Sequence, residues 1–282
     1  MPRPRPEAVA LGEQYHLGLR LPPTSGAVGQ ARGRGAGASV EFLDHRHYIL
    51  GDDIRHLDWR AFARTDQLLV KRYQEEIRPT LEILVDGSAS MQLDPDKAAL
   101  AVDLTAMLAS AARADGMQVR VTLLSDRPEP IAVDRLLGEG LTFASRLPLQ
   151  DAARQAVPRL RPGCLCVLLS DFLSPHEPSQ LVRPLGARVG GFALLQVLSG
   201  DDIAPKIGGA ARLEDVETGQ TVDLVLDRAT VAAYLQRLGR LSDGLREASF
   251  RGGGCFARLR SDVSLAEQCR TQLVGAGVLR ID

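Results

Sequence analysis

Short apolar runs alternate with amphipathic stretches from about residue 80 onward. Residues 81–85, with the sequence LEILV, form an apolar run that ends in a polar turn, which is typical of a strand buried in a parallel sheet. Asp94 and Pro95 then provide an N-cap and a first helical residue, and large apolar residues follow at helical spacing as far as Asp115 and Gly116. A strand followed by a helix in this order predicts an α/β domain.

The same pattern continues along the chain and completes the predicted fold class. Strands are predicted at residues 119–124, 164–170, 191–198 and 255–259, with a short antiparallel edge at residues 130–133. Helices are predicted at residues 149–160, 179–185 and 264–273, and a long helix is predicted to start after Asp227. Residues 211–225 predict a β-hairpin around a Thr218–Gly219 turn. We expect a mostly parallel sheet with helices on both faces, an N-terminal extension and a C-terminal β-hairpin insertion.

Two segments precede this predicted domain of residues 79–282. Residues 1–38 are rich in proline, glycine and arginine and show no periodicity that would bury one face, so we expect a flexible arm with room for one short helix. Residues 39–78 read as short strands and loops with few, scattered apolar residues. These are too few to offset an ordering entropy of about 1–2 kcal/mol per residue, so we expect this segment to pack on the main domain. Trp59, the only tryptophan, is interpreted as a core anchor.

Composition excludes several classes of protein. Hydrophobic residues make up 45% of the chain and charged residues 24%, as in soluble globular proteins. The formal net charge of −1 provides no field that would attract nucleic acid or an anionic membrane. We find neither an apolar run of about 18 residues nor the apolar region of a signal peptide, so we expect no membrane span and a cytoplasmic location. The cysteines are interpreted as buried free thiols, with a soft-metal pair at Cys164 and Cys166 left open.

Candidate chemistry lies where two predicted strands end. Asp86, Ser88 and Ser90 follow the strand of residues 81–85, and Asp171 follows the strand of residues 164–170. Because ligands gather at the carboxyl ends of strands in open α/β sheets, adjacent parallel strands would bring the two aspartates into one cleft. Carboxylate and hydroxyl oxygens suit Mg²⁺ or Mn²⁺. The alternative is a capped turn between strand and helix, since Asp and Ser also satisfy free amides at helix starts.

These motifs carry a family resemblance. Asp86-x-Ser88-x-Ser90, followed by Met91, resembles the first motif of the metal-ion-dependent adhesion site of von Willebrand factor A domains, and Asp171 matches the later aspartate of that site. Two further motifs are similar to those of the bacterial family called domain of unknown function 58, namely Tyr48-x-x-Gly51-Asp52-Asp53-x-Arg55-x-x-Asp58-Trp59-x-x-x-Ala63-Arg64 and Asp215-x-Glu217-Thr218-Gly219. The resemblance implies a von Willebrand factor A-like (Rossmann-like) fold and a role beside a MoxR-type AAA+ ATPase.

One residue of the adhesion site has no clear counterpart in this chain. The position that corresponds to its threonine falls near Leu147 and Pro148, which have no side-chain oxygen, and Thr142 is the nearest substitute. Losing one direct oxygen ligand predicts weak, hydrated metal binding. The charged segment formed by Asp52, Asp53, Arg55, Asp58, Trp59 and Arg64 is either a partner surface or an internal ion-pair network. Three histidines in or near it, His45, His47 and His56, lack the spacing of a zinc site and are expected to be solvated or salt-bridged.

The leading functional hypothesis is a non-enzymatic interaction module in which a partner carboxylate completes the coordination of a bound cation. The enzyme alternative is a Mg-dependent phosphohydrolase with Asp86 as nucleophile, but Ser88 stands where such enzymes place a second aspartate. Residues 87–90 do not fit the G-x-S-x-G elbow of serine hydrolases. The chain also lacks a G-x-x-x-x-G-K-S/T loop, so any ATP hydrolysis is expected to come from a partner.

Overall fold

The computed structural model describes residues 1–19, 40–75, 79–174, 176–216 and 219–281. It divides into two compact units. The main unit combines Met1–Thr24 with Pro79–Asp282, and the second unit is Ser25–Arg78. The second unit is therefore an insertion in the sequence of the main unit.

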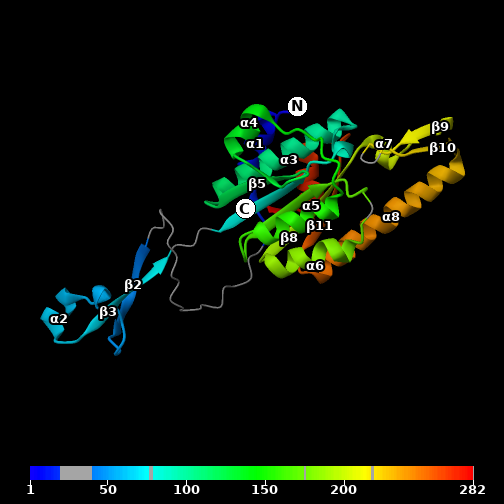
Figure 1. The fold of residues 1–282 in the computed structure, drawn as a ribbon. Helices are drawn as coiled ribbons and strands as arrows, with labels where there is room; N and C mark the ends of the chain where they lie inside the picture. Colours follow the sequence, from blue (N-terminus) through cyan, green and yellow to red (C-terminus); the bar gives the residue numbers. More distant parts are fainter. Residues whose placement is uncertain (20–39, 76–78, 175, 217–218, 282) are drawn as a thin grey trace. The chain divides into compact units, whose positions relative to one another are not determined.

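A six-stranded sheet forms the centre of the main unit (Figure 1). Its strands, in spatial order, are β11 (Cys255–Arg260), β8 (Gly191–Leu198), β7 (Leu165–Ser170), β4 (Thr80–Asp86), β5 (Gln118–Leu124) and β6 (Glu129–Ile131). All neighbours are parallel except β6, which pairs antiparallel with β5 at the edge. The predicted parallel sheet and its antiparallel edge are confirmed, and β4 lies in the interior as expected for a run that is buried at every residue.

Helices cover both faces of this sheet, as predicted. Figure 1 shows α1 (Pro6–Gly12), α3 (Pro95–Ala114) and α4 (Val133–Glu139) on one side and α5 (Leu149–Ala156), α6 (Pro178–Arg188) and α8 (Arg228–Arg251) on the other. The apolar core accordingly forms two clusters, because successive strand residues point to opposite faces. Among the described residues, no helix is both long enough and apolar enough to cross a membrane.

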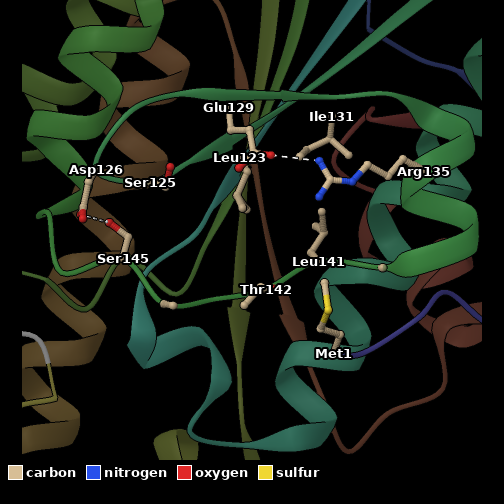
Figure 2. Close-up of a pocket in the computed structure, with 12 residues that line it drawn as sticks. Met1, Leu123, Ser125, Asp126, Glu129, Ile131, Arg135, Leu141, Thr142 and Ser145 are labelled. Carbon is tan, nitrogen blue, oxygen red and sulfur yellow. Dashed lines mark hydrogen bonds and ion pairs between the residues drawn. The ribbon is translucent and has the colours of Figure 1, made fainter.

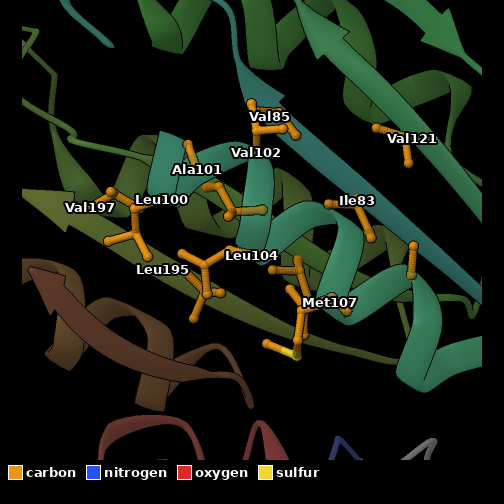
Figure 3. Packing of buried hydrophobic residues seen from close by; sticks show 14 of the residues in the cluster. Ile83, Val85, Leu100, Ala101, Val102, Leu104, Met107, Val121, Leu195 and Val197 are labelled. Carbon is orange, nitrogen blue, oxygen red and sulfur yellow. The ribbon is translucent and has the colours of Figure 1, made fainter. Parts of the chain in front are cut away.

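Helix α3 is the central helix of the larger cluster. The Asp94 side chain caps it by accepting hydrogen bonds from the backbone N–H groups of residues 96 and 97 at 2.8 and 2.9 Å. Leu104 and Met107 on α3 pack towards Ile83 of β4 and Leu195 of β8 (Figure 3). Each such fully buried side chain contributes about 1.5–3 kcal/mol, so this interface is a major source of stability for the main unit.

Residues 1–19 belong to the main unit, and the prediction of a flexible arm is wrong for them. Helix α1 packs on α3, and the short strand β1 (His16–Leu17) pairs antiparallel with β12 (Leu279–Arg280). Arg5 forms an ion pair at 2.6 Å with Asp103, whose side chain is fully buried in α3. A few buried residues and one ion pair with a residue distant in sequence hold this segment in place. Such contacts leave no periodic pattern in so short a stretch, so the sequence does not reveal them. Residues 20–38 of the predicted arm lie outside the described residues.

The remaining elements of the main unit follow the prediction in order. After α7 (Gly200–Ile203), β9 (Gly209–Glu214) and β10 (Thr221–Leu226) form the predicted antiparallel hairpin, although Thr218 of its turn lies outside the described residues. Asp227 caps α8 by accepting a hydrogen bond from the Thr230 N–H at 2.8 Å. The predicted final helix divides into α9 (Leu265–Gln268) and a π-helical turn, η4 (Cys269–Leu273), and short 3₁₀ turns occur at η2 (Ala89–Gln92) and η3 (Val157–Arg159).

The second unit contains a two-stranded antiparallel sheet of β2 (Val40–His47) and β3 (Leu69–Glu75). Between the strands lie a 3₁₀ turn, η1 (Ile54–His56), and a helix, α2 (Trp59–Thr65). The interpretation of Trp59 as a core anchor is wrong, because its side chain is the first of α2 and is 61% exposed while Leu57, Ala61 and Val70 are buried. The predicted packing of residues 39–78 on the main domain stays a prediction.

Candidate functional site

The two predicted aspartates lie at the carboxyl edge of the sheet. Strands β4 and β7 are parallel neighbours in which Val85 pairs with Leu169, so Asp86 ends one strand and Asp171 directly follows the other. Both carboxylates are buried, with exposed fractions of 3% and 1%. The sequence argument that adjacent strands would bring them together therefore matches the geometry.

Asp86 is held by contacts to both of its carboxylate oxygens. Its Oδ1 accepts a hydrogen bond from the Ser88 N–H at 2.9 Å, and its Oδ2 accepts one from the Ser170 hydroxyl at 2.5 Å. Burial, reinforced by the nearby charge of Asp171 and opposed by these hydrogen bonds, raises the pKa of Asp86 to about 6. The Ser170 hydroxyl also accepts from the Phe172 N–H at 2.8 Å, so it ties the end of β7 to both Asp86 and the following residue.

Ser88 and Ser90 lie together beside Asp86, with their hydroxyl oxygens 3.0 Å apart. Ser88 is buried, whereas Ser90 is half-buried and lies within η2. The chain leaves β4 at Gly87, whose carbonyl accepts hydrogen bonds from the N–H groups of residues 144 and 145, both at 2.9 Å. These bonds hold the turn that carries the two serines. The two serines thus present hydroxyls at the edge where the aspartates lie.

Thr142 does not join this group. It is exposed and lines a pocket of about 300 Å³ with Asp126 and Ser145 (Figure 2). The hydroxyl next to the serine motif belongs instead to Ser145, which forms a parallel β-bridge with Ser88 and was missed by counting back from Asp171. The Ser145 hydroxyl donates to Asp126 at 2.9 Å and accepts from the Leu147 N–H at 3.1 Å, so it is already engaged.

Lys97 is the most important site residue that the sequence analysis missed. Its ammonium lies 3.0 Å from Asp171 Oδ2 and 3.5 Å from Asp202 Oδ2, and its side chain is only 3% exposed. Tyr234 of α8 lies near the same carboxylates, and burial followed by the charges of Asp202 and Asp171 raises its pKa to about 12. The available signal was the rarity of lysine in a chain whose basic residues are almost all arginine.

Further polar contacts fix the backbone behind Asp171. The Gln196 side chain in β8 donates to the Asp171 carbonyl at 3.1 Å and accepts from the Ser242 hydroxyl of α8 at 2.7 Å. Phe172 has a φ of 58°, which is unusual for a residue with a side chain, and it is fully buried. Such backbone strain persists only where surrounding contacts determine the conformation, and it is concentrated at functional sites.

The oxygen atoms at this edge are of the kind that binds a hard cation such as Mg²⁺, but groups of the chain itself already occupy the carboxylate oxygens. Each carboxylate oxygen of Asp86 and Asp171 already has a partner within the chain, and Lys97 supplies positive charge to Asp171. Among the described residues, no group of three or more His, Cys, Asp and Glu side chains gathers in a way that would hold a metal. The cysteines are free thiols, and burial raises the pKa of Cys164 to about 11.

The charged segment of the second unit is satisfied internally. Asp52 accepts two hydrogen bonds from Arg46, at 2.7 and 2.6 Å, and Asp53 pairs with Arg55 at 2.7 Å. Asp58 caps α2 and contacts His45 at 2.9 Å; the hydrogen bond from the Ala61 N–H, followed by that from His45, lowers the pKa of Asp58 to about 2.

Trp59 and Arg64 are the exposed residues of this segment within α2, and Arg55 before the helix is exposed too, with 84% of its side chain accessible. The Arg64 side chain donates to the Arg60 carbonyl at 3.2 Å, and Trp59 makes an edge-to-face contact with Phe62. The aspartates therefore shape the loop and cap the helix, while the exposed face of α2 and the Arg55 side chain are available to a partner.

Comparisons with known proteins add a family but no activity. A crystal structure described as an aerotolerance-related membrane protein from Bacteroides fragilis NCTC 9343 with multiple mutations to serines is similar at 14% identity and a TM-score of 0.38, covering 68% of this chain and 94% of that chain. No curated protein matches the chain. The sequence profile of the family described as "Protein of unknown function DUF58" matches residues 44–241, which span both units. Because the match covers well over half of the sequence, the chain belongs to this family.

Proposed function

We propose that the chain is a non-enzymatic protein-interaction module of the von Willebrand factor A type, with its recognition surface at the carboxyl edge of the six-stranded sheet. The observation that carries this proposal is the placement of Asp86, Ser88, Ser90 and Asp171 at the ends of the neighbouring strands β4 and β7. Open α/β sheets bind ligands outside the carboxyl ends of their strands. The half-buried Ser90 hydroxyl gives a partner access to this group.

The strained backbone at Phe172 supports the same location. Its positive φ follows Asp171 directly and is held by the Ser170 hydroxyl, so the strand end is kept in one defined conformation. A binding edge benefits from this rigidity because less conformational entropy is lost when the partner binds.

The proposed partner is a MoxR-type AAA+ ATPase, which the resemblance to the domain of unknown function 58 family implies. Because this chain has no phosphate-binding loop of its own, nucleotide hydrolysis would belong to that partner, and the encounter would take place in the cytoplasm, where the ATP is. Mg²⁺ or Mn²⁺ is proposed as a weak ligand of the same edge, because its donors are hydroxyl and carboxylate oxygens.

The alternative of a Mg-dependent phosphohydrolase has no support from the geometry. Asp86 is 3% exposed, and both of its oxygens accept hydrogen bonds within the chain. A nucleophilic carboxylate needs a free oxygen facing the substrate and a nearby general acid. The residue two positions later is Ser88, which cannot serve as that acid.

The proposal is tested by measuring the affinity of the full chain for the MoxR-type ATPase of its source organism. Asp86→Ala and Ser90→Ala should each weaken binding by about tenfold or more, equivalent to about 1.4 kcal/mol, while circular dichroism shows an intact fold. Glu247→Ala is a matched control, because Glu247 is exposed and lies near the end of α8, which leads to the amino end of β11.

Chelation by EDTA should weaken the binding of the unmutated protein in the same assay. If Asp86→Ala, Ser90→Ala and EDTA all leave the affinity unchanged, the carboxyl edge is not the interface. The exposed face of α2 around Trp59 is then the next surface to test.

A further inference from the structure

Lys97 lies where an ammonium group is intrinsically unfavourable. It is the third residue of α3, and the first turn of a long helix favours negative charge rather than positive charge. Its side chain is also 97% removed from solvent, since only 3% is exposed. Two carboxylates contact the ammonium in this buried position, Asp171 at 3.0 Å and Asp202 at 3.5 Å. The lysine is therefore held as a cation by these two carboxylates.

Both carboxylates are themselves fixed. Asp171 Oδ1 accepts from the Leu173 N–H at 3.0 Å, and Asp202 Oδ2 accepts from the Ser199 N–H at 2.8 Å in the capping box of α7. Lys97 therefore joins three separate parts of the fold, namely α3, the end of β7 and the start of α7. The ammonium lies nearer to Asp171 than to Asp202, so its stronger contact is with the strand-end carboxylate.

The charges at this edge do not balance. Asp86, Asp171 and Asp202 supply three carboxylates, and Lys97 is the one ammonium among the described residues that forms an ion pair with any of them. Asp86 itself has no cationic partner among its printed contacts, since its oxygens accept from the Ser88 N–H and the Ser170 hydroxyl. A divalent cation would supply further positive charge, but both Asp171 oxygens already have partners, the Leu173 N–H and the Lys97 ammonium.

From this arrangement we infer that Lys97 is the built-in cation of the strand-end site and competes with a divalent metal ion for Asp171. The inference rests on the proposed function, because it concerns the same edge of the sheet, and it explains why a cation is not needed to hold that edge together. The buried ammonium offers no open position to a partner carboxylate, whereas a hydrated metal ion would. If Lys97 gave up its contact with Asp171, its ammonium would keep a partner in Asp202, which already lies within 3.5 Å.

The inference is tested by titrating the full chain with Mn²⁺ in the absence of any partner, followed by electron paramagnetic resonance and calorimetry. Lys97→Gln and Lys97→Met should bind Mn²⁺ about tenfold or more tightly than the unmutated chain, because a competing positive charge has been removed. Lys97→Arg keeps the charge and should leave the affinity unchanged. Lys206→Met is a matched control at a lysine whose side chain is 89% exposed. Adding Asp86→Ala to Lys97→Gln should abolish the gain and thereby locate the metal.

Thermal unfolding in EDTA and in excess Mn²⁺ provides a second readout. The charge-removing variants should have a lower Tm in EDTA and recover in Mn²⁺, since a ligand that binds only the folded state stabilises it. Equal Mn²⁺ affinity in all the variants, or unfolding of Lys97→Gln that Mn²⁺ does not reverse, would overturn the inference. Because no partner is present, these outcomes are independent of whether the ATPase binds this edge.

Discussion

Removal of the Arg5 side chain should destabilise the main unit, because it leaves a buried carboxylate without its charged partner. Asp103 is fully buried in α3 and accepts hydrogen bonds from the Arg5 backbone N–H at 2.8 Å and from its Nε at 2.6 Å. The Arg5 Nη2 completes the ion pair at 2.6 Å. Arg5→Ala keeps the backbone contact and removes both guanidinium contacts.

The magnitude follows from the exposure of the two partners. Breaking a buried ion pair by removing one member costs about 3–5 kcal/mol. The Arg5 side chain is 63% exposed, so water can enter the vacated space, and we expect a smaller loss of about 2–3 kcal/mol. For a unit of this size, that loss corresponds to a decrease in Tm of about 5–10 °C.

The long helices α3 and α8 lie in the main unit, so far-ultraviolet circular dichroism follows the unfolding of this unit. The urea transition measured in this way should shift to lower concentration in Arg5→Ala. Arg3→Ala removes an exposed arginine two residues earlier and should leave the transition in place.

Replacement of both partners separates the ion pair from simple packing. In the double variant Arg5→Ala, Asp103→Leu, most of the lost stability should return, because an apolar residue of similar size replaces the orphaned carboxylate. A free energy of unfolding for Arg5→Ala within about 0.5 kcal/mol of the unmutated chain, the range of an ordinary surface substitution, would show that Asp103 does not need the guanidinium.

Three further predictions concern other parts of the main unit. The pKa of about 6 for Asp86 exceeds the unfolded value of about 3.9, so the free energy of unfolding should fall by about 2–3 kcal/mol as the pH rises from about 4 through 6. Asp86→Asn should remove this fall. Urea unfolding that keeps the same pH dependence in the variant would contradict the assignment. Gly140 has a φ of 78°, and an added Cβ would clash with the Pro2 carbonyl oxygen. Gly140→Ala should therefore lower the free energy of unfolding by about 2 kcal/mol or more. A near-neutral change would show that the N-terminal segment can move away at little cost. Burial raises the pKa of Cys164 to about 11 and that of Cys166 well above its usual value, so neither thiol should react with a disulfide reagent until the protein unfolds, and rapid labelling of the native chain would argue against their burial.

The sheet and the placement of the aspartates were predictable because they depend on local patterns. Each apolar run that stops at a polar residue became a strand, and parallel neighbours necessarily place Asp86 and Asp171 at one edge. The cap at Asp94 also follows from a local rule that joins a side chain to amides two and three residues later. These features required no knowledge of contacts between distant parts of the sequence.

The features that were missed depend on distant contacts. Lys97 meets Asp171 across 74 residues, and Arg5 meets Asp103 across 98 residues, so neither pairing leaves a periodic signal. Trp59 was misinterpreted because a single aromatic residue does not reveal which face of a short helix it occupies; the helix begins at Trp59, and that position points outward. Ser145 was missed because counting back from Asp171 cannot locate a loop whose path is set by hydrogen bonds to Gly87.

The pairing of β1 with β12 also constrains how the protein is made. Leu17 contacts Leu279 in this pair, so the main unit needs residues from both ends of the sequence before its fold is complete. During translation, the second unit of residues 25–78 leaves the ribosome long before β12 does, and domains generally begin to fold as they emerge. Helix α1 can pack once α3 has formed, but β1 must wait for β12, and until then Leu17 remains available to chaperones.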